Sequence, residues 1–256
     1  MNISLAAEPI FHLGSFAITN SILVALILSI FFIIITLVLH SRKLKEAPTG
    51  FQNLIEAVVE GALKFVESVT GDRQKAVKFF PLVATIFFFV LFSNWIGLLP
   101  GVGSIGINEV HNGHQVLVPF LRSASADLNA TLAIAIISVL GTQIFGIVAI
   151  GFFKQTGKFL NFHFLKKFNF QNITMFFVGL LELVSEVAKM ISFSFRLFGN
   201  IFAGEVLLIV VAVLVPYLAP LPFIFLEIFV GLVQALVFSL LTLVFLTIAT
   251  VQHAEN

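Results

Sequence analysis

Five long apolar runs constrain the fold of this chain more than any other feature of its sequence. A helix that crosses the roughly 30 Å hydrocarbon core of a bilayer needs about 20 mainly apolar residues. The runs that meet this length cover residues 20–40, 79–100, 129–153, 171–215 and 222–251. Three prolines in "PYLAPLP" separate the last two runs and stop a helix there. The sequence therefore predicts an all-α polytopic membrane protein with five membrane-crossing helices, of which the last two form a helical hairpin.

Composition agrees with this fold class and excludes several others. Hydrophobic residues make up 59% of the 256 residues and charged residues only 11%, which is far from the composition of water-soluble domains. The chain has no cysteine, so disulfides and cysteine-based metal sites are excluded, and its six histidines are scattered singly. Neither a repeat period nor a linker divides the chain. We expect a single membrane domain over residues 1–256, with no cofactor, no metal and no nucleic acid as a partner.

Two segments differ from a simple perpendicular crossing. The run over residues 171–215 is about twice as long as a perpendicular helix needs, so it must tilt steeply, lie partly in the membrane plane or break; we favour a strong tilt. The segment over residues 50–70 places Glu56, Glu60, Lys64 and Glu67 between apolar residues at helical spacing. This pattern predicts an amphipathic helix on the membrane surface.

The distribution of basic residues predicts the orientation of the crossings. Of the 14 Lys and Arg residues, seven lie between Arg42 and Lys78 and four between Lys154 and Lys167, whereas the loop over residues 100–126 holds only Arg122. Loops rich in Lys and Arg face the cytoplasm. Five crossings then place the N-terminus and the 100–126 loop outside and the C-terminus in the cytoplasm. We favour a bacterial inner membrane, with an organelle-encoded inner membrane protein as the alternative.

The longest apolar run carries charged side chains. An arginine at mid-bilayer costs roughly 2.5–3.5 kcal/mol on insertion scales, so such residues usually face protein or water and serve transport. At about 100° per residue, most of the polar side chains of this run fall on one narrow stripe of the helix. The stripe contains Glu182, Glu186, Lys189, Arg196 and Asn200, with Ser185 and Ser192 on its border.

Glu205 lies off this stripe, and the last helix offers it a neighbour. Glu205 is half a turn round the helix from Arg196 and about 13 Å along the axis, so it is not the intrahelical partner of Arg196. In the last helix Glu227 and Gln234 share a face. A hairpin can bring Glu205 and Glu227 together near the outer side and Gln234 toward Arg196. The pattern suggests two polar paths that meet near a permanently charged arginine, which repels cations and attracts a carboxylate of another protein.

Simpler roles remain open for most of these residues. Glu186 and Lys189 are three residues apart and can form a simple ion pair near the cytoplasmic interface. Arg196 can form a structural salt bridge inside the bundle. Asn200 and Gln234 can hydrogen-bond helices to one another.

Residues outside the charged stripe have simple roles as well. Asp127 and Asn129 in "ADLNAT" stand at the start of the third crossing, where they form either a helix cap or the mouth of an aqueous path; we favour the cap. Gly199 and Gly204, with the small Ala203 near them, predict close packing of helices.

Several of these motifs together resemble subunit a of F-type ATP synthases. They are "FRLFGNIFAGE" (195–205), "LEIFVGLVQALVF" (226–238), "SNWIGLLPG" and "ADLNAT", and the resemblance covers nearly the whole chain. It implies a stator with two offset half-channels that works against a rotating ring of c subunits. The implied partners are the c-ring, b-type peripheral stalk subunits, the rest of the ATP synthase complex and the lipid bilayer. The chain has no P-loop, so it has no catalytic centre of its own for nucleotides; H⁺ and Na⁺ both remain open as the transported ion.

The resemblance also implies roles for single residues. Arg196 faces the carboxylates of the ring, Glu205 and Glu227 line the outer half-channel, and Asn200 and Gln234 neighbour the arginine. Glu182 belongs to the cytoplasmic path. Weaker candidates for ion translocation are Glu186, Lys189, Ser192, Asp127 and Asn129.

A self-contained secondary cation transporter is the alternative function. Glu182, Glu186, Glu205 and Glu227 would then bind the transported cation. Such a transporter predicts inverted internal repeats and broken helices. The sequence shows neither, apart from the proline-rich turn.

Overall fold

The structure is a computed structural model that describes residues 7–14, 16–41, 50–99, 101–111, 114–159 and 170–250. Five of its helices are long and apolar enough to cross a membrane, which confirms the predicted fold class. Their bounds are α1 Asn20–Ser41, α3 Arg73–Ile96, α4 Leu128–Ile150, α6 Phe170–Leu214 and α7 Pro220–Thr250. The basic segments over residues 42–49 and 160–169, on which part of the predicted orientation rests, lie outside the described residues, as do residue 251 and the remaining C-terminus.

The bounds of helices α3 and α4 differ from the prediction. Helix α3 begins at Arg73 rather than at residue 79, because Asp72 caps it by accepting a hydrogen bond of 2.7 Å from the backbone N–H of Gln74, and it ends at Ile96 rather than at residue 100. Helix α4 ends at Ile150 rather than at residue 153. Gly151 follows it with φ of 99°, a conformation that L side chains rarely adopt, and the short helix α5 (Phe152–Phe159) then begins.

The hairpin of α6 and α7 contains the proline-rich turn. Helix α6 is a single unbroken helix over Phe170–Leu214, so the predicted alternative of a break is wrong. At 1.5 Å per residue it is roughly 68 Å long, which is about twice the thickness of a hydrocarbon core. Helix α7 begins at Pro220 rather than at residue 222. Prolines are tolerated in the first turn of a helix, where the missing N–H has no intrahelical partner anyway.

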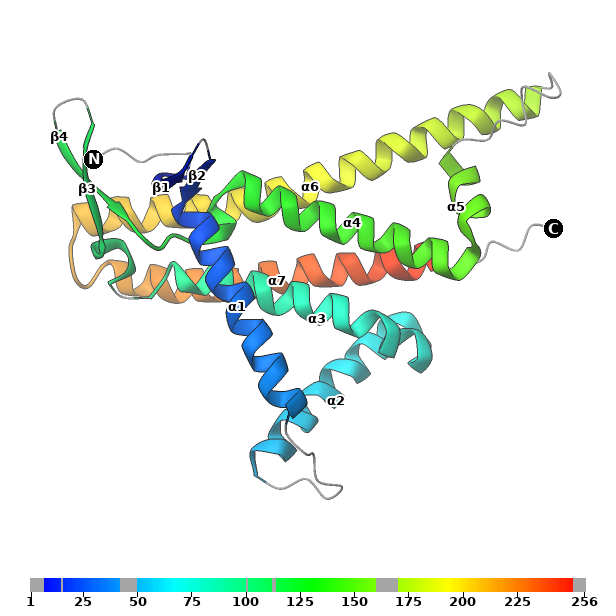
Figure 1. Cartoon of the computed structure of the whole chain (residues 1–256), viewed down its shortest axis with the longest axis horizontal. Helices are drawn as coiled ribbons and strands as arrows, with labels where there is room; N and C mark the ends of the chain where they lie inside the picture. The colour runs from blue at the N-terminus through cyan, green and yellow to red at the C-terminus, as the bar shows by residue number, and fades with distance from the viewer. Residues whose placement is uncertain are drawn as a thin grey trace.

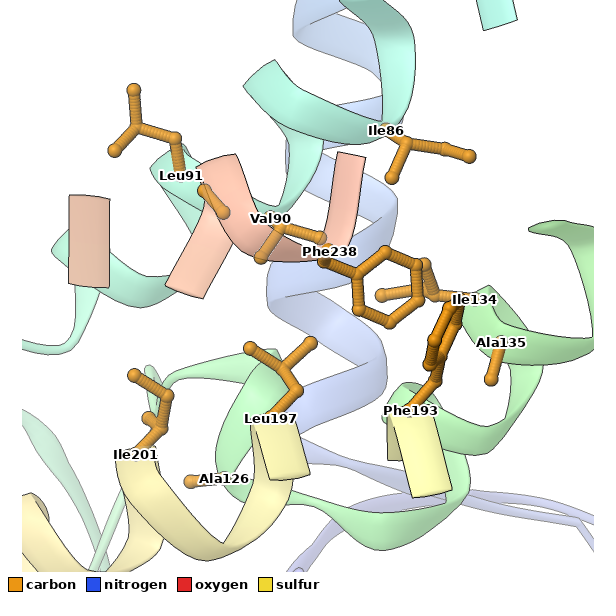
Figure 2. Close-up of a cluster of buried hydrophobic side chains, with 11 residues drawn as sticks. Ile86, Val90, Leu91, Ala126, Ile134, Ala135, Phe193, Leu197, Ile201 and Phe238 are labelled. Atoms are coloured by element: carbon orange, nitrogen blue, oxygen red, sulfur yellow. The ribbon is translucent and has the colours of Figure 1, made fainter. Parts of the chain in front are cut away.

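The core of the bundle lies where α3, α4, α6 and α7 meet. Val90 of α3, Leu197 of α6 and Phe238 of α7 are all buried there (Figure 2). The ring centroids of Phe193 in α6 and Phe238 are 5.1 Å apart. Helix α1 packs at the side through Val24 and Leu28. The half of α6 that begins at Phe170 diverges from α4 and α7 toward α5 (Figure 1).

Helix α2 (Phe51–Thr70) is amphipathic, as predicted. Its Val66 packs against α3 and α7, whereas Leu54 and Val58 are exposed. At the corner between α2 and α3, Arg73 forms ion pairs of 2.9 Å with Glu60 and 3.0 Å with Glu67. The hydrogen bond from the Arg73 guanidinium lowers the pKa of the Glu60 carboxyl. The placement of α2 on a membrane surface stays a prediction.

Two small antiparallel hairpins were not predicted. They consist of β1 (Pro9–Leu13) with β2 (Phe16–Thr19) and β3 (Gly106–His111) with β4 (His114–Pro119). Figure 1 shows the β3–β4 hairpin and the α6–α7 turn at the same end of the bundle, opposite α5. The loop that contains β3 and β4 is predicted to lie outside, and the two crossings α4 and α6 between it and the α6–α7 turn put that turn on the same side.

Candidate functional site on helices α6 and α7

The polar stripe of α6 contains one internal ion pair. The Lys189 Nζ lies 2.6 Å from Glu186 Oε1 and 4.5 Å from the ring centroid of Phe245 in α7. Both charged side chains are partly buried. These two residues therefore form the simple pair that their spacing allows, and the pair is held against α7 by an ammonium–aromatic contact.

Among the charged residues of this stripe, Arg196 is the one whose side chain is exposed. Its side chain is exposed, as are those of Asn200 and Ser192, while Glu182 and Gln234 are partly buried. No hydrogen bond or ion pair joins Arg196 to another residue in the described part of the chain, so the alternative of a structural salt bridge is not found there, and Gln234 forms no hydrogen bond with Arg196. Its neighbours one helical turn away, Ser192 and Asn200, are exposed on the same face, and Phe195 beside it in sequence is an exposed apolar side chain. Arg196 therefore points away from its own bundle, on the outer surface of an otherwise apolar helix.

Glu205 has a partner that sequence reasoning did not find. Arg122 Nε lies 3.0 Å from Glu205 Oε1 and 3.1 Å from Oε2, and Arg122 Nη2 lies 3.0 Å from Oε2. The Arg122 side chain is only 8% exposed and that of Glu205 is 31% exposed. The sequence placed Arg122 in a loop 83 residues from Glu205 and counted it only as a loop cation. Its one available signal was that the outer loop holds a single basic residue.

Glu227 lies on the other side of the hairpin, against a glycine that precedes Glu205. A Cβ atom added to Gly204 would clash with the carboxyl atoms of Glu227, so this position of the carboxyl requires a glycine at residue 204. The predicted role of Gly204 in close packing is confirmed, whereas nothing lies within 4 Å of the same position at Gly199. Glu227 is buried, and it forms no hydrogen bond or ion pair with another described residue. The structure thus brings the Glu227 carboxyl to the turn of α6 that carries Glu205.

Two side chains of α3 fix α7 next to Glu227. Trp95 Nε1 donates to the carbonyl of Ile228 at 3.1 Å, and Asn94 Nδ2 donates to the carbonyl of Gly231 at 2.9 Å. Both acceptors lie within about one helical turn of Glu227. These hydrogen bonds hold the backbone of α7 against α3, and they were not anticipated from the sequence.

Asp127 is a helix cap, as favoured. Its Oδ1 accepts a hydrogen bond of 2.9 Å from the N–H of Asn129, and its Oδ2 accepts one of 2.6 Å from the hydroxyl of Ser21 in α1. The carboxyl is buried, while Asn129 is exposed. Asp127 therefore joins the start of α4 to the start of α1. Among the described residues, no group of His, Cys, Asp and Glu could hold a metal ion.

The fold and this site define a class: a helical multi-pass membrane protein with charged residues along two adjoining long helices. The family model described as "ATP synthase A chain" matches residues 19–247. Among similar proteins, ATP synthase subunit a of Campylobacter jejuni is 37% identical over 241 residues, which are 94% of this chain and 89% of that protein. ATP synthase subunit a of Geobacter sulfurreducens is 34% identical over 214 residues, 84% of this chain and 80% of that protein. The chain belongs to the ATP synthase A chain family.

Proposed function

We propose that this chain is the stator that carries protons past a rotating ring of c subunits in an F-type ATP synthase. The proposal rests on the observation that the Arg196 side chain is exposed and has no hydrogen bond or ion pair among the described residues. A guanidinium on the outer surface of a mainly apolar membrane helix needs a partner, because an unpaired charge in hydrocarbon costs several kcal/mol. A carboxylate on another subunit supplies that partner, and α6 presents Arg196 to it.

The two sides of the arginine would serve separate paths. Glu205 and Glu227, at the end of the bundle near the α6–α7 turn, would form the outer path, and Glu182 would belong to the cytoplasmic path. Asn200 and Gln234 would line the region near the arginine. A ring carboxylate ionises beside Arg196, and it is protonated again from the other path before it returns to lipid. Its neutral form is the one that hydrocarbon tolerates.

The energy for this cycle comes from the membrane. Each elementary charge that crosses gains about 2.3 kcal/mol per 100 mV, to which the pH difference adds. The guanidinium of Arg196 is a cation that repels protons, so it would block their direct passage between the two paths. Rotation of the ring would carry the energy to soluble subunits that make ATP. An unbroken α6 and α7 count against the alternative of a secondary transporter, which relies on broken helices.

The test is ATP-driven proton pumping in inverted membrane vesicles that contain the assembled complex. The assay uses fluorescence quenching in nominally sodium-free buffer, so that H⁺ rather than Na⁺ is the transported ion. Arg196→Ala is expected to abolish pumping, with passive proton leak retained or increased. Arg73→Ala is the matched control, because it removes an arginine that is exposed at the α2–α3 corner. Normal coupled pumping by Arg196→Ala would refute the proposed role.

A further inference from the structure

We infer that Arg122 is a positioning residue of the outer proton path: its guanidinium fixes the carboxylate of Glu205 beside Glu227. This inference rests on the proposed function. It starts from the bidentate contact, in which Arg122 Nε and Nη2 both reach the Glu205 carboxylate at 3.0–3.1 Å. The planar guanidinium matches both oxygens of a carboxylate and fixes the plane of that group, which a lysine cannot do.

Glu205 needs such a partner because the helix does not direct it to Glu227. The Glu227 carboxyl lies against Gly204, and the next residue on an α-helix points about 100° away from the one before it. The glutamate side chain has several rotatable bonds, so its carboxylate can occupy many positions. Arg122 selects one of them, on the turn of α6 that Glu227 reaches.

The segment around Arg122 is rigid enough for this task. Residues 123–127, which follow Arg122, are all buried. The Ser123 hydroxyl donates to the carbonyl of Ser93 at 2.8 Å, and a Cβ atom on Gly97 would lie only 3.1 Å from the Ser123 Cβ. The guanidinium also lies 6.0 Å from the ring centroid of Phe202, one turn before Glu205 on α6. Both the chain segment next to Arg122 and the guanidinium itself are therefore held in place.

In the proposed outer path, the proton transfers begin at Glu205. A proton from the outer side binds a Glu205 carboxylate oxygen and breaks its hydrogen bond with Arg122. The proton then leaves that oxygen for the carboxylate of Glu227, and the Glu205 carboxylate returns to the guanidinium. Glu227 in turn gives its proton to the ionised carboxylate of the ring, so both glutamates are again free to accept a proton. Arg122 donates no proton in this sequence; it returns Glu205 to the same position after each transfer.

The experiment measures ATP synthesis by the purified complex in proteoliposomes at a fixed pH difference and membrane potential. Arg122→Gln is expected to lower the rate roughly ten- to a hundredfold, the range that loss of positioning costs. Arg122→Lys keeps the positive charge but lacks the planar guanidinium that contacts both oxygens of Glu205. This variant is expected to recover part of the rate. In a Glu205→Gln background, Arg122→Gln should change the rate by less than about twofold, because the group on which it acts is gone. Arg73→Gln, which makes the same substitution at the exposed α2–α3 corner, is the matched control, and co-purification with ring subunits reports assembly.

Three results would overturn the inference. The first is a normal rate for assembled Arg122→Gln, and the second is a full additive loss in the double variant, which would assign Arg122 a role independent of Glu205. If Arg122→Gln does not assemble, assembled Arg122→Lys decides: a lowered rate supports the inference, and an unchanged rate refutes it. Arg196→Ala in the same liposomes separates the two proposals, because loss of synthesis in Arg196→Ala with normal rates in all Arg122 variants refutes only the role of Arg122.

Discussion

Glu205 and Arg196 both lie on helix α6, but their charges have opposite environments. Glu205 is held by the buried guanidinium of Arg122, whereas Arg196 is exposed and has no ion pair within the described residues. A charge that is buried inside a fold must be neutralised by that fold, because an uncompensated buried ion costs several kcal/mol. A charge on the outer surface of the same helix is free of that requirement. The contrast separates the paired charge of the site from the exposed one, which the proposed function assigns to a partner subunit.

Stability measurements should show this contrast with the largest effect. Arg122→Leu leaves the Glu205 carboxylate without its partner and is expected to cost about 2 kcal/mol, less than the 3–5 kcal/mol of a fully buried pair because Glu205 is 31% exposed. Arg196→Leu is expected to change stability by less than about 0.5 kcal/mol, as at other surface positions. Thermal unfolding of the purified chain in detergent measures both. Equal losses in the two variants would mean that the contrast has no energetic basis.

Two of the glycines of α6, Gly204 and Gly199, offer a second comparison. Gly204→Ala places a methyl group where the Glu227 carboxyl lies, so that carboxyl must move, at an expected cost of about 1 kcal/mol. Gly199→Ala meets nothing within 4 Å and serves as the control. Proton pumping should fall in Gly204→Ala and not in Gly199→Ala, because the former displaces Glu227, which the proposed function places in the outer proton path. Unchanged pumping in Gly204→Ala would show that the position of the Glu227 carboxyl is not critical.

A smaller effect is expected from the hydroxyl groups that join the closed part of the bundle. Ser138 of α4 and Thr242 of α7 are both buried, and their hydroxyls lie 2.8 Å apart. Ser138→Ala should cost about 0.6 kcal/mol, the average for interhelical hydrogen bonds in membranes. Ser29→Ala is the control, since its exposed hydroxyl bonds only to its own helix. A double-mutant cycle with Thr242→Val measures the coupling, and zero coupling would contradict the assignment.

The smallest effect is expected at the α2–α3 corner, where the charges are paired but exposed. Arg73→Ala removes the ion pairs with Glu60 and Glu67, which water and salt already weaken. Arg73 lowers the pKa of Glu60 from 4.5 in the folded chain, so the stabilisation is present above pH 4.5 and is lost as pH falls through the lowered pKa. Thermal unfolding of wild type and variant should therefore converge toward acid pH and in high salt. A difference that grows toward acid pH would have the wrong sign.

Spacing along the chain was enough to predict the five long helices, the amphipathic helix α2 and some local contacts, but not the short helix α5. The apolar runs gave five spans, the i,i+3 spacing of Glu186 and Lys189 gave an ion pair, and Asp127 before a helix gave a cap. Each depends on residues that are close in sequence, where helical geometry fixes the distances. The β hairpins and the start of α3 at Arg73 were missed because short strands and capped polar turns give no apolar run.

The amino-acid sequence thus decided the fold class and named Arg196, Glu205 and Glu227 as the charges that require an explanation, because the cost of a charge in an apolar helix depends on composition alone. Only the tertiary structure decided which of them is paired. Arg122 reaches Glu205 across 83 residues, and the Glu227 carboxyl fits against Gly204 of another helix. Such contacts depend on how helices and loops meet in space, and helical periodicity carries no information about that meeting.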